Sequence, residues 1–160
     1  MSMQVCNFES LGALQPEVGK ELAVSDWFDI RQDRVTRFAE DTEDRQWIHI
    51  DPDRASRESP YGGTIAHGYL TLSLLPYLAN SCIRLGGVRM AVNYGLNRVR
   101  FMSPVLVGKR IRARFKLLAC DALGQDVASG GAQVIWQATV EVEGIDKPAC
   151  VAEVISRRYP

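Results

Sequence analysis

Apolar residues recur at two different spacings along this chain, and the change of spacing separates a helical first half from a β-rich second half. Val35, Phe38, Ala39 and Thr42 fall on one stripe of a 3.6-residue period, which predicts a helix. Between positions 111 and 117 apolar and basic residues alternate, which predicts a half-buried strand. The chain therefore combines helices and strands in successive blocks, as an α+β protein does.

The stretch from about Ala66 to Ile83 is apolar on nearly every side. We expect it to form a long helix that other structure wraps. Pro76 lies inside it and removes one backbone hydrogen bond, so we predict a kink there. We expect Gly86 and Gly87 to end the helix.

Further strands are predicted on either side of this helix, and residues 1–17 read as an irregular N-terminal arm. The expected strands are Lys20–Ser25, Ala91–Met102 with a break near Gly95, the region 111–117, Val134–Val142 and Ala149–Arg157. We predict a single domain over residues 1–160, with one antiparallel sheet and helices packed on one face. Its exposed edge strands favour pairing of two sheets in a homodimer.

Composition and net charge exclude some classes of binding partner. Of 160 residues, 46% are hydrophobic, enough for a real core, and 19 basic residues balance 19 acidic ones. No net basic field attracts nucleic acid or an anionic membrane surface. The apolar stretch 66–83 is short of the roughly 20 apolar residues that span a bilayer. We expect a protein with no nucleic-acid or membrane partner.

The cysteines and the N-terminus indicate the compartment. Cys6, Cys82, Cys120 and Cys150 are scattered, with neither a CxxC pair nor a metal-type spacing. The first residues lack the basic and apolar regions of a signal peptide. We therefore predict reduced thiols, a cytoplasmic location and no bound metal.

The first candidate for chemistry is the polar segment after the first helix. Asp44 and His49 lie five positions apart, across the end of a helix, and both can point into one cavity. A carboxylate and a neutral imidazole can share one water and move its proton. The competing interpretation is that Asp44 is a solvated loop acid.

The second candidate is the start of the apolar helix, Ile65-Ala66-His67-Gly68. The first amides of a helix have no internal partner and carry partial positive charge. The amide of Gly68 could therefore stabilise an oxyanion on a substrate carbonyl. Alternatively, Gly68 only permits close packing and His67 is a hydrogen-bonded structural histidine.

Together the two segments resemble the MaoC-like hydratases. The run Thr-Glu-Asp-x-x-x-Ile-His-Ile-Asp is followed, sixteen residues after its histidine, by Ile-Ala-His-Gly, and the similarity extends from about Val18 to Val154. Gln46-Trp47-Ile48-His49, Tyr61-Gly62-Gly63-Thr64 and Asn93-Tyr94-Gly95-Leu96 are most similar to the branch called nodulation-protein-N-like.

This resemblance implies a hot-dog fold, in which a curled antiparallel sheet wraps a long helix, and a homodimer. It implies an (R)-specific enoyl-CoA hydratase, or 3-hydroxyacyl-CoA dehydratase, that adds water reversibly to a trans-2-enoyl thioester. Asp44 and His49 match the family's catalytic pair, and the resemblance implies that Gly68 supplies the amide that meets the thioester oxygen. Ile65, Ala66 and His67 are expected to bind substrate.

The resemblance also implies that no cofactor is needed, because coenzyme A arrives as part of the substrate. Arg98, Arg100, Lys109 and Arg112 are available for its phosphates. The chain departs from the family at Gln46-Trp47, where many members carry Asn-Pro, and at Pro76, where some carry a hydroxyl. These departures bear on acyl-chain specificity.

Two rival functions are weighed against the hydratase. A hot-dog thioesterase usually places a carboxylate on or near the central helix, whereas residues 66–83 contain no Asp or Glu. A non-catalytic module that binds acyl thioesters would not need both Asp44 and His49. The sequence therefore favours the hydratase.

Overall fold

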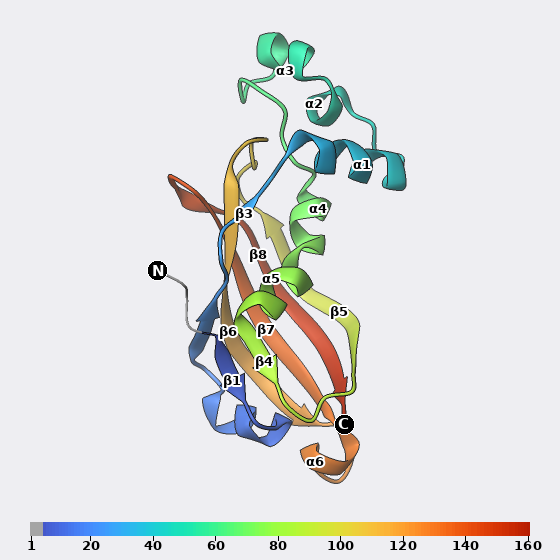
Figure 1. Cartoon of the computed structure of the whole chain (residues 1–160), viewed down its shortest axis with the longest axis vertical. Helices are drawn as coiled ribbons and strands as arrows, with labels where there is room; N and C mark the ends of the chain where they lie inside the picture. Colours follow the sequence, from blue (N-terminus) through green and yellow to red (C-terminus); the bar gives the residue numbers. More distant parts are fainter. Residues whose placement is uncertain (1–4) are drawn as a thin grey trace.

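A strongly curled antiparallel sheet forms the body of the molecule in the computed structural model, which describes residues 5–160 (Figure 1). Its strands follow the spatial order β2-β6-β7-β8-β5, and the short β3 pairs with β6. The strands are β2 (Glu21–Val24), β3 (Phe28–Asp29), β5 (Met90–Phe101), β6 (Arg110–Ala122), β7 (Ala132–Val142) and β8 (Ile145–Tyr159). This confirms the predicted α+β class.

The burial of residues along the strands follows the alternation of apolar and polar residues in the sequence. In β7 every second residue is buried, from Ala132 to Val142. In β6 the apolar members of the alternating run are buried while Arg112 and Arg114 are partly exposed and pair with Glu141. The predicted break near Gly95 is not present, because β5 is continuous from Met90 to Phe101; the irregularity there is a register shift between Asn93 and Gly95 where β5 pairs with β8.

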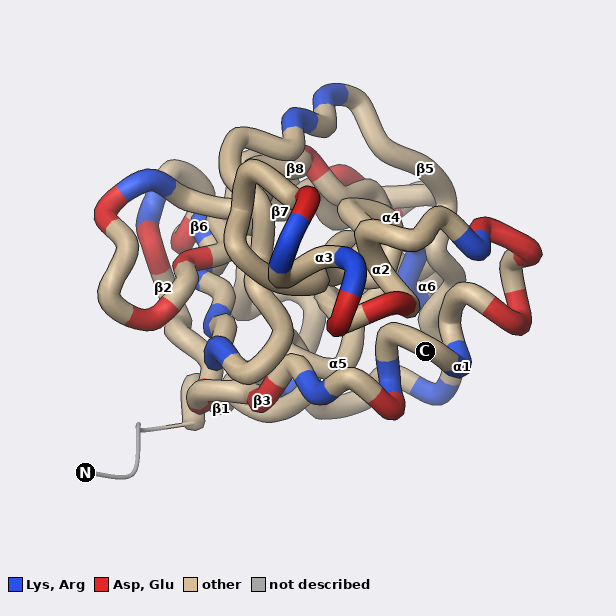
Figure 2. Tube along the Cα trace, turned by 90° about the horizontal axis from the view of Figure 1, so that it is seen from above, with Lys and Arg blue, Asp and Glu red and all other residues tan. Residues whose placement is uncertain are grey.

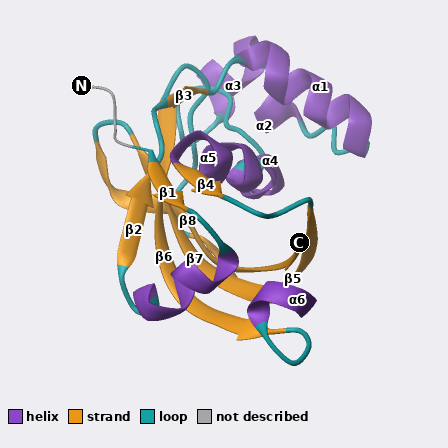
Figure 3. Cartoon of the chain, turned by 60° about the horizontal axis from the view of Figure 1, so that its bottom comes forward, coloured by secondary structure: helices purple, strands orange, loops and turns teal. Residues whose placement is uncertain are grey.

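The apolar stretch lies in the hollow of the sheet as two helical segments rather than one helix (Figure 3). These are α4 (Gly68–Ser73) and α5 (Leu75–Cys82), interrupted at Leu74. The break occurs where Pro76 lacks the N–H that an unbroken helix would donate to Leu72. The predicted irregularity at Pro76 is thus confirmed, but wrapping is incomplete, since Tyr69 and Tyr77 are more than half exposed.

The prediction for the end of this helix was wrong. A short strand, β4 (Ile83–Leu85), follows α5 directly, so Gly86 and Gly87 form the turn after β4. β4 pairs in parallel with β1 (Cys6–Phe8). β-branched Ile83 favours leaving the helix into a strand.

The prediction of an irregular arm over residues 1–17 was also wrong in part. Residues 6–8 form β1, and Leu11–Glu17 form a 3₁₀ helix whose Leu11 and Leu14 are buried. Burial of these two leucines holds the segment against the sheet. Residues 1–4 lie outside the described part of the chain.

Three helices gather at one end of the molecule (Figure 1), and a fourth, α6, lies at the other end. They are α1 (Gln32–Thr42), α2 (Trp47–Ile50), α3 (Pro52–Glu58) and α6 (Val127–Gly130). The predicted stripe on α1 is confirmed in part: Val35 and Ala39 are buried and Phe38 is half-buried, whereas Thr42, at the end of the helix, is exposed. Acidic and basic residues alternate along much of the trace, and neither kind is confined to one part of it (Figure 2). No helix within residues 5–160 is long and apolar enough to cross a membrane.

Candidate active site

The segment between α1 and α4 holds the candidate acid and base on short, anchored elements. Asp44 lies in the loop that follows Glu43, whose left-handed conformation (φ 60°) ends α1. His49 lies in the single turn α2. The side chain of Gln32 donates to the carbonyl oxygen of His49 at 2.7 Å and accepts from Thr64 Oγ1 at 2.6 Å. One amide thus ties α1, α2 and the segment before α4 together.

His49 is buried, with 6% of its surface exposed, and its ring orientation is fixed. Its Nδ1 lies 2.7 Å from the carbonyl oxygen of Ile65. A carbonyl only accepts, so this nitrogen carries the proton, and Nε2 keeps the lone pair in the neutral ring. Burial lowers the pKa of His49 and the neighbouring His67 lowers it further, against opposing effects of the Ile65 hydrogen bond and Asp44.

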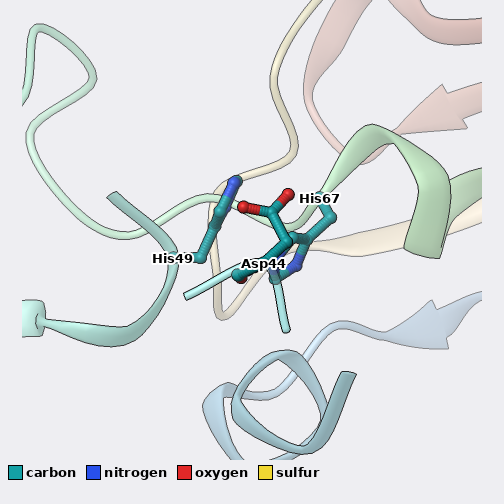
Figure 4. A group of neighbouring side chains, drawn as sticks. All are labelled: Asp44, His49 and His67. Atoms are coloured by element: carbon teal, nitrogen blue, oxygen red, sulfur yellow. Dashed lines mark hydrogen bonds between the residues drawn. The ribbon is translucent and has the colours of Figure 1, made fainter. Parts of the chain in front are cut away.

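Asp44, His49 and His67 form one group, in which side-chain ligand atoms all lie within 4.8 Å of one another (Figure 4). That separation allows one water to bridge the Asp44 carboxylate and the His49 ring. Asp44 is exposed, so solvent reaches this point from outside. The predicted pair is therefore close in space, on the side of α4 where the helix begins.

His67 contacts both Asp44 and His49. Its Nε2 donates to the backbone carbonyl oxygen of Asp44 at 2.9 Å. Its ring stacks on that of His49, with centroids 3.7 Å apart and planes 24° from parallel. Among the described residues, Asp44, His49 and His67 are also the group whose ligand atoms lie close enough together to hold a metal ion.

A cavity of about 320 Å³ opens beside this group. His49, Ile65, Ala66 and Gly68 all line it, whereas Asp44 and His67 are not among its lining residues. Gly68 is the first residue of α4, so its amide has no acceptor within the helix. A Cβ at this position would lie 2.9 Å from ring atoms of Phe101, so Gly68 also permits close packing.

Several residues of the site were missed by sequence reasoning. Gln32 lies on the buried face of α1, three residues before Val35 and seven before Ala39, so a polar residue within that stripe is the signal that could have found it. Thr64 appeared only within the run Tyr61-Gly62-Gly63-Thr64. The cavity also includes Thr71, a buried hydroxyl one turn after Gly68. Trp47, one of the two residues at which the chain departs from the family, does not line the cavity; the guanidinium of Arg54 lies over its ring, 4.4 Å from the centroid.

A curled antiparallel sheet around a helical segment, with a cavity at the helix start, defines a protein of the hot-dog class. Residues 13–136 match the family model described as MaoC like domain, and the chain belongs to that family. It is 49% identical over 150 residues to 3-hydroxyacyl-thioester dehydratase Z of Mycobacterium tuberculosis, covering 94% of this chain and 96% of that protein. It is 43% identical over 148 residues to Nodulation protein N of Rhizobium leguminosarum bv. viciae, covering 92% and 89%.

Solved structures agree on the fold. R-hydratase PhaJ1 from Pseudomonas aeruginosa, in its unliganded form, superposes with a TM-score of 0.71 at 20% identity, covering 94% of this chain and 86% of that one. The (R)-hydratase from A. caviae involved in PHA biosynthesis gives 0.69 at 23% identity, covering 90% and 97%. The family and its members identify this chain as an enzyme, a hydro-lyase of the hydratase and dehydratase type.

Proposed function

We propose that this enzyme adds water reversibly to trans-2-enoyl-CoA thioesters, giving (R)-3-hydroxyacyl-CoA, with Asp44 and His49 as its acid–base pair. The observation that carries the proposal is the position of the pair. A carboxylate and a neutral imidazole nitrogen lie within bridging distance of one water, and the imidazole lines a cavity that also contains the first amide of α4. The product configuration rests on the family resemblance.

Asp44 and His49 hold the attacking water between them. As its oxygen bonds to C3 of the enoyl group, the pair takes one proton from the water and returns one proton to C2. Water is thereby added across the double bond with no net change in the enzyme. His49 is suited to accept because its Nδ1 proton is held by the Ile65 carbonyl oxygen, which leaves Nε2 unprotonated.

The Gly68 amide stabilises the thioester oxygen. During addition, electron density moves from the double bond onto that oxygen, and a positioned N–H donor lowers the energy of the resulting enolate-like state. Ile65 and Ala66 contact the substrate from the same cavity wall. His67 is not among the residues lining the cavity, so we assign it to holding the pair rather than to binding the substrate.

Coenzyme A enters only as part of the substrate, and no metal or redox group takes part in these steps. Among the cations considered for its phosphates, Arg112 is already paired with Glu141 at 2.6 Å. Arg98 and Arg100 lie on the exposed strand β5 and have no carboxylate partner within residues 5–160. Lys109 has no such partner within these residues either, so we favour Arg98, Arg100 and Lys109 for phosphate binding.

We further propose a homodimer in which two copies of β5 pair antiparallel. β5 is an edge strand of twelve residues with a neighbour, β8, on one side only. Met90, Val92, Tyr94 and Leu96 are large, apolar and exposed along it. An exposed edge of this length and composition favours pairing with a second copy. A cytoplasmic location remains a prediction, supported by four free cysteines.

The test is hydration of crotonyl-CoA, followed by loss of enoyl absorbance and by the configuration of the product. We expect Asp44→Asn and His49→Gln each to lower kcat by about 10²–10⁴, the range for loss of a general acid–base group. Glu40→Gln is the matched control, because Glu40 is an exposed acid on α1. Near-normal rates in either site variant, at unchanged thermal stability, would refute the pair. Release of free thiol without loss of enoyl absorbance would indicate thioester hydrolysis instead.

A further inference from the structure

A second cavity, of about 450 Å³, lies beyond the first along the central helix. It is bounded by α5, by the start of β5 and by the inner faces of β6, β7 and β8, and it shares no lining residue with the first cavity. Leu75, Ala79, Phe115, Trp136 and Val154 provide apolar walls. The volume falls in the range of small-molecule sites.

Positive charge faces these apolar walls. Arg84, Arg89 and Arg158 line the cavity, and no Asp or Glu is among its lining residues. Arg84 already donates to the backbone carbonyl oxygen of Asn80. The cavity therefore has excess positive charge beside an aliphatic and aromatic surface.

Arg158 is the unusual member of this set. On β8 it follows Val154 and Ser156 at two-residue spacing, and all three line the cavity, so its side chain lies on the inner face of the sheet. Its Nε donates to Ser156 Oγ at 3.2 Å, and no carboxylate within residues 5–160 forms an ion pair with it. Burial lowers the pKa of its guanidinium.

A partly buried guanidinium without an anion costs free energy of folding. At the neighbouring Arg157 this cost is offset by other contacts. Its guanidinium carbon lies 3.6 Å from the centre of the Tyr94 ring, and its Nε donates to Gln133. The planar fork of an arginine binds a carboxylate through two parallel hydrogen bonds. The missing partner of Arg158 is thus best supplied by a ligand.

We propose that this cavity binds an aliphatic chain that ends in a carboxylate, with the carboxylate on Arg158 and the chain against Trp136, Phe115 and Leu75. The carboxylate belongs either to a free medium-chain acid or to the far end of a dicarboxylic acyl thioester. Both present the same chemistry to the cavity. The inference concerns residues outside the acid–base pair and does not depend on the proposed hydration reaction.

Decanoate is the probe, and Trp136 reports its binding. The chain has three tryptophans, so replacing Trp27 and Trp47 by Phe leaves the fluorescence of Trp136 alone. We expect saturable binding of decanoate to this protein and at least tenfold weaker binding to Arg158→Gln, as loss of a charge-assisted hydrogen bond produces. Arg157→Gln is the matched control and should bind as well as the parent protein.

Two further measurements keep the outcome decisive. Ala79→Leu fills the cavity and leaves Arg158 in place, so it should abolish decanoate binding. This variant tests the cavity independently if Arg158→Gln does not fold. Equal binding of decanoate to the Arg158→Gln protein, or equally tight binding of the neutral 1-decanol, would overturn the proposal. So would an absence of saturable binding.

Hydration kinetics then identify the source of the carboxylate. Competitive inhibition of crotonyl-CoA hydration by decanoate, lost in Arg158→Gln, assigns the cavity to a dicarboxylic acyl substrate. Binding without competition assigns it to a free acid. If the protein binds decanoate but hydrates no enoyl-CoA, the carboxylate site stands and the proposed function fails.

Discussion

The rings of His49 and His67 stack face to face, with centroids 3.7 Å apart, although the two residues are eighteen positions apart in the chain. His49 carries the proposed base, and the Nε2 of His67 donates to the backbone carbonyl oxygen of Asp44, the other member of the proposed pair. The ring of Phe38 also contacts the ring of His67, with centroids 5.0 Å apart. The buried imidazole of His67 therefore contacts α1, the Asp44 loop and α2, and it lies at the start of α4.

A positioning role for His67 predicts a particular kinetic signature. His67→Phe keeps a flat ring against His49 but removes the donor to the Asp44 carbonyl oxygen. It also removes Nδ1, a buried nitrogen with no hydrogen-bond partner within the described residues. We expect kcat for crotonyl-CoA to fall about tenfold, with KM and the melting temperature little changed. A large rise in KM with unchanged kcat would mean that His67 binds substrate after all.

The lowered pKa of His49 sets the acid limb of the pH profile. Its ordinary value is about 6.5. Because the base must be neutral, kcat/KM should stay constant as the pH falls through 6.5 and decline only nearer the lowered pKa. A midpoint at or above 6.5 would contradict the assignment of His49 as the base.

The same shift predicts how stability depends on pH. Between the lowered folded pKa and the unfolded value of about 6.5, the unfolded chain binds more protons at this residue than the folded one, so the free energy of unfolding rises with pH. The contribution is complete above about pH 6.5 and is lost as the pH falls through the window below it. Urea unfolding of the wild type and His49→Gln between pH 4 and 8 (roughly the window around the ordinary His pKa) should show a smaller slope in the variant.

Much of this arrangement was predictable because it depends on local patterns. The alternation in β6 and β7, the stripe on α1 and the interruption caused by Pro76 each follow from side-chain period or from a missing N–H. The spacing of Asp44, His49 and Gly68 was recognised as a set through a family resemblance. The irregularity near Gly95 follows from the weak strand propensity of glycine.

What could not be predicted depends on contacts between distant residues. Gln32 bridges His49 and Thr64 through a single amide, and its place on the buried stripe of α1 does not tell which groups that amide meets. The pairing of β1 with β4 joins segments about 77 positions apart and fixes a stretch that lacks any regular period. Arg158 also escaped notice, because a charge near a chain end reads as solvated.

The contact between Gly68 and Phe101 predicts a steric defect that a second substitution relieves. In Gly68→Ala the new methyl would lie 2.9 Å from Cγ and Cδ2 of Phe101, so the ring or the start of α4 must move. Overpacking of this kind costs about 1–3 kcal/mol of stability, and movement of the first amide of α4 should lower kcat. Phe101→Leu in the same chain should recover most of the stability. If the double variant is as unstable as Gly68→Ala, the contact is not the cause.

The Gln32 bridge predicts a loss of both stability and rate. Gln32→Leu leaves Thr64 Oγ1 and the His49 carbonyl oxygen without their side-chain partner, which costs about 1–3 kcal/mol for buried groups. Because His49 then loses its anchor to α1, kcat should fall as well. Gln46→Leu is the matched control, since the exposed Gln46 makes no side-chain capping bond. Chemical denaturation and crotonyl-CoA kinetics measure the two effects, and equal behaviour of both variants would remove Gln32 from the site.

The edge strand β5 predicts the behaviour of the protein in solution. Leu96 lies in the middle of β5 and is 45% exposed in the single chain. Because a twofold interface presents every residue twice, Leu96→Lys places two like charges in the proposed contact and should shift the protein from dimer to monomer. Val18→Lys is the control, because Val18 is similarly exposed, at 44%, but lies outside β5. Light scattering after size-exclusion chromatography gives the mass of each variant. A Leu96→Lys protein that remains dimeric would show that the two copies meet through another surface.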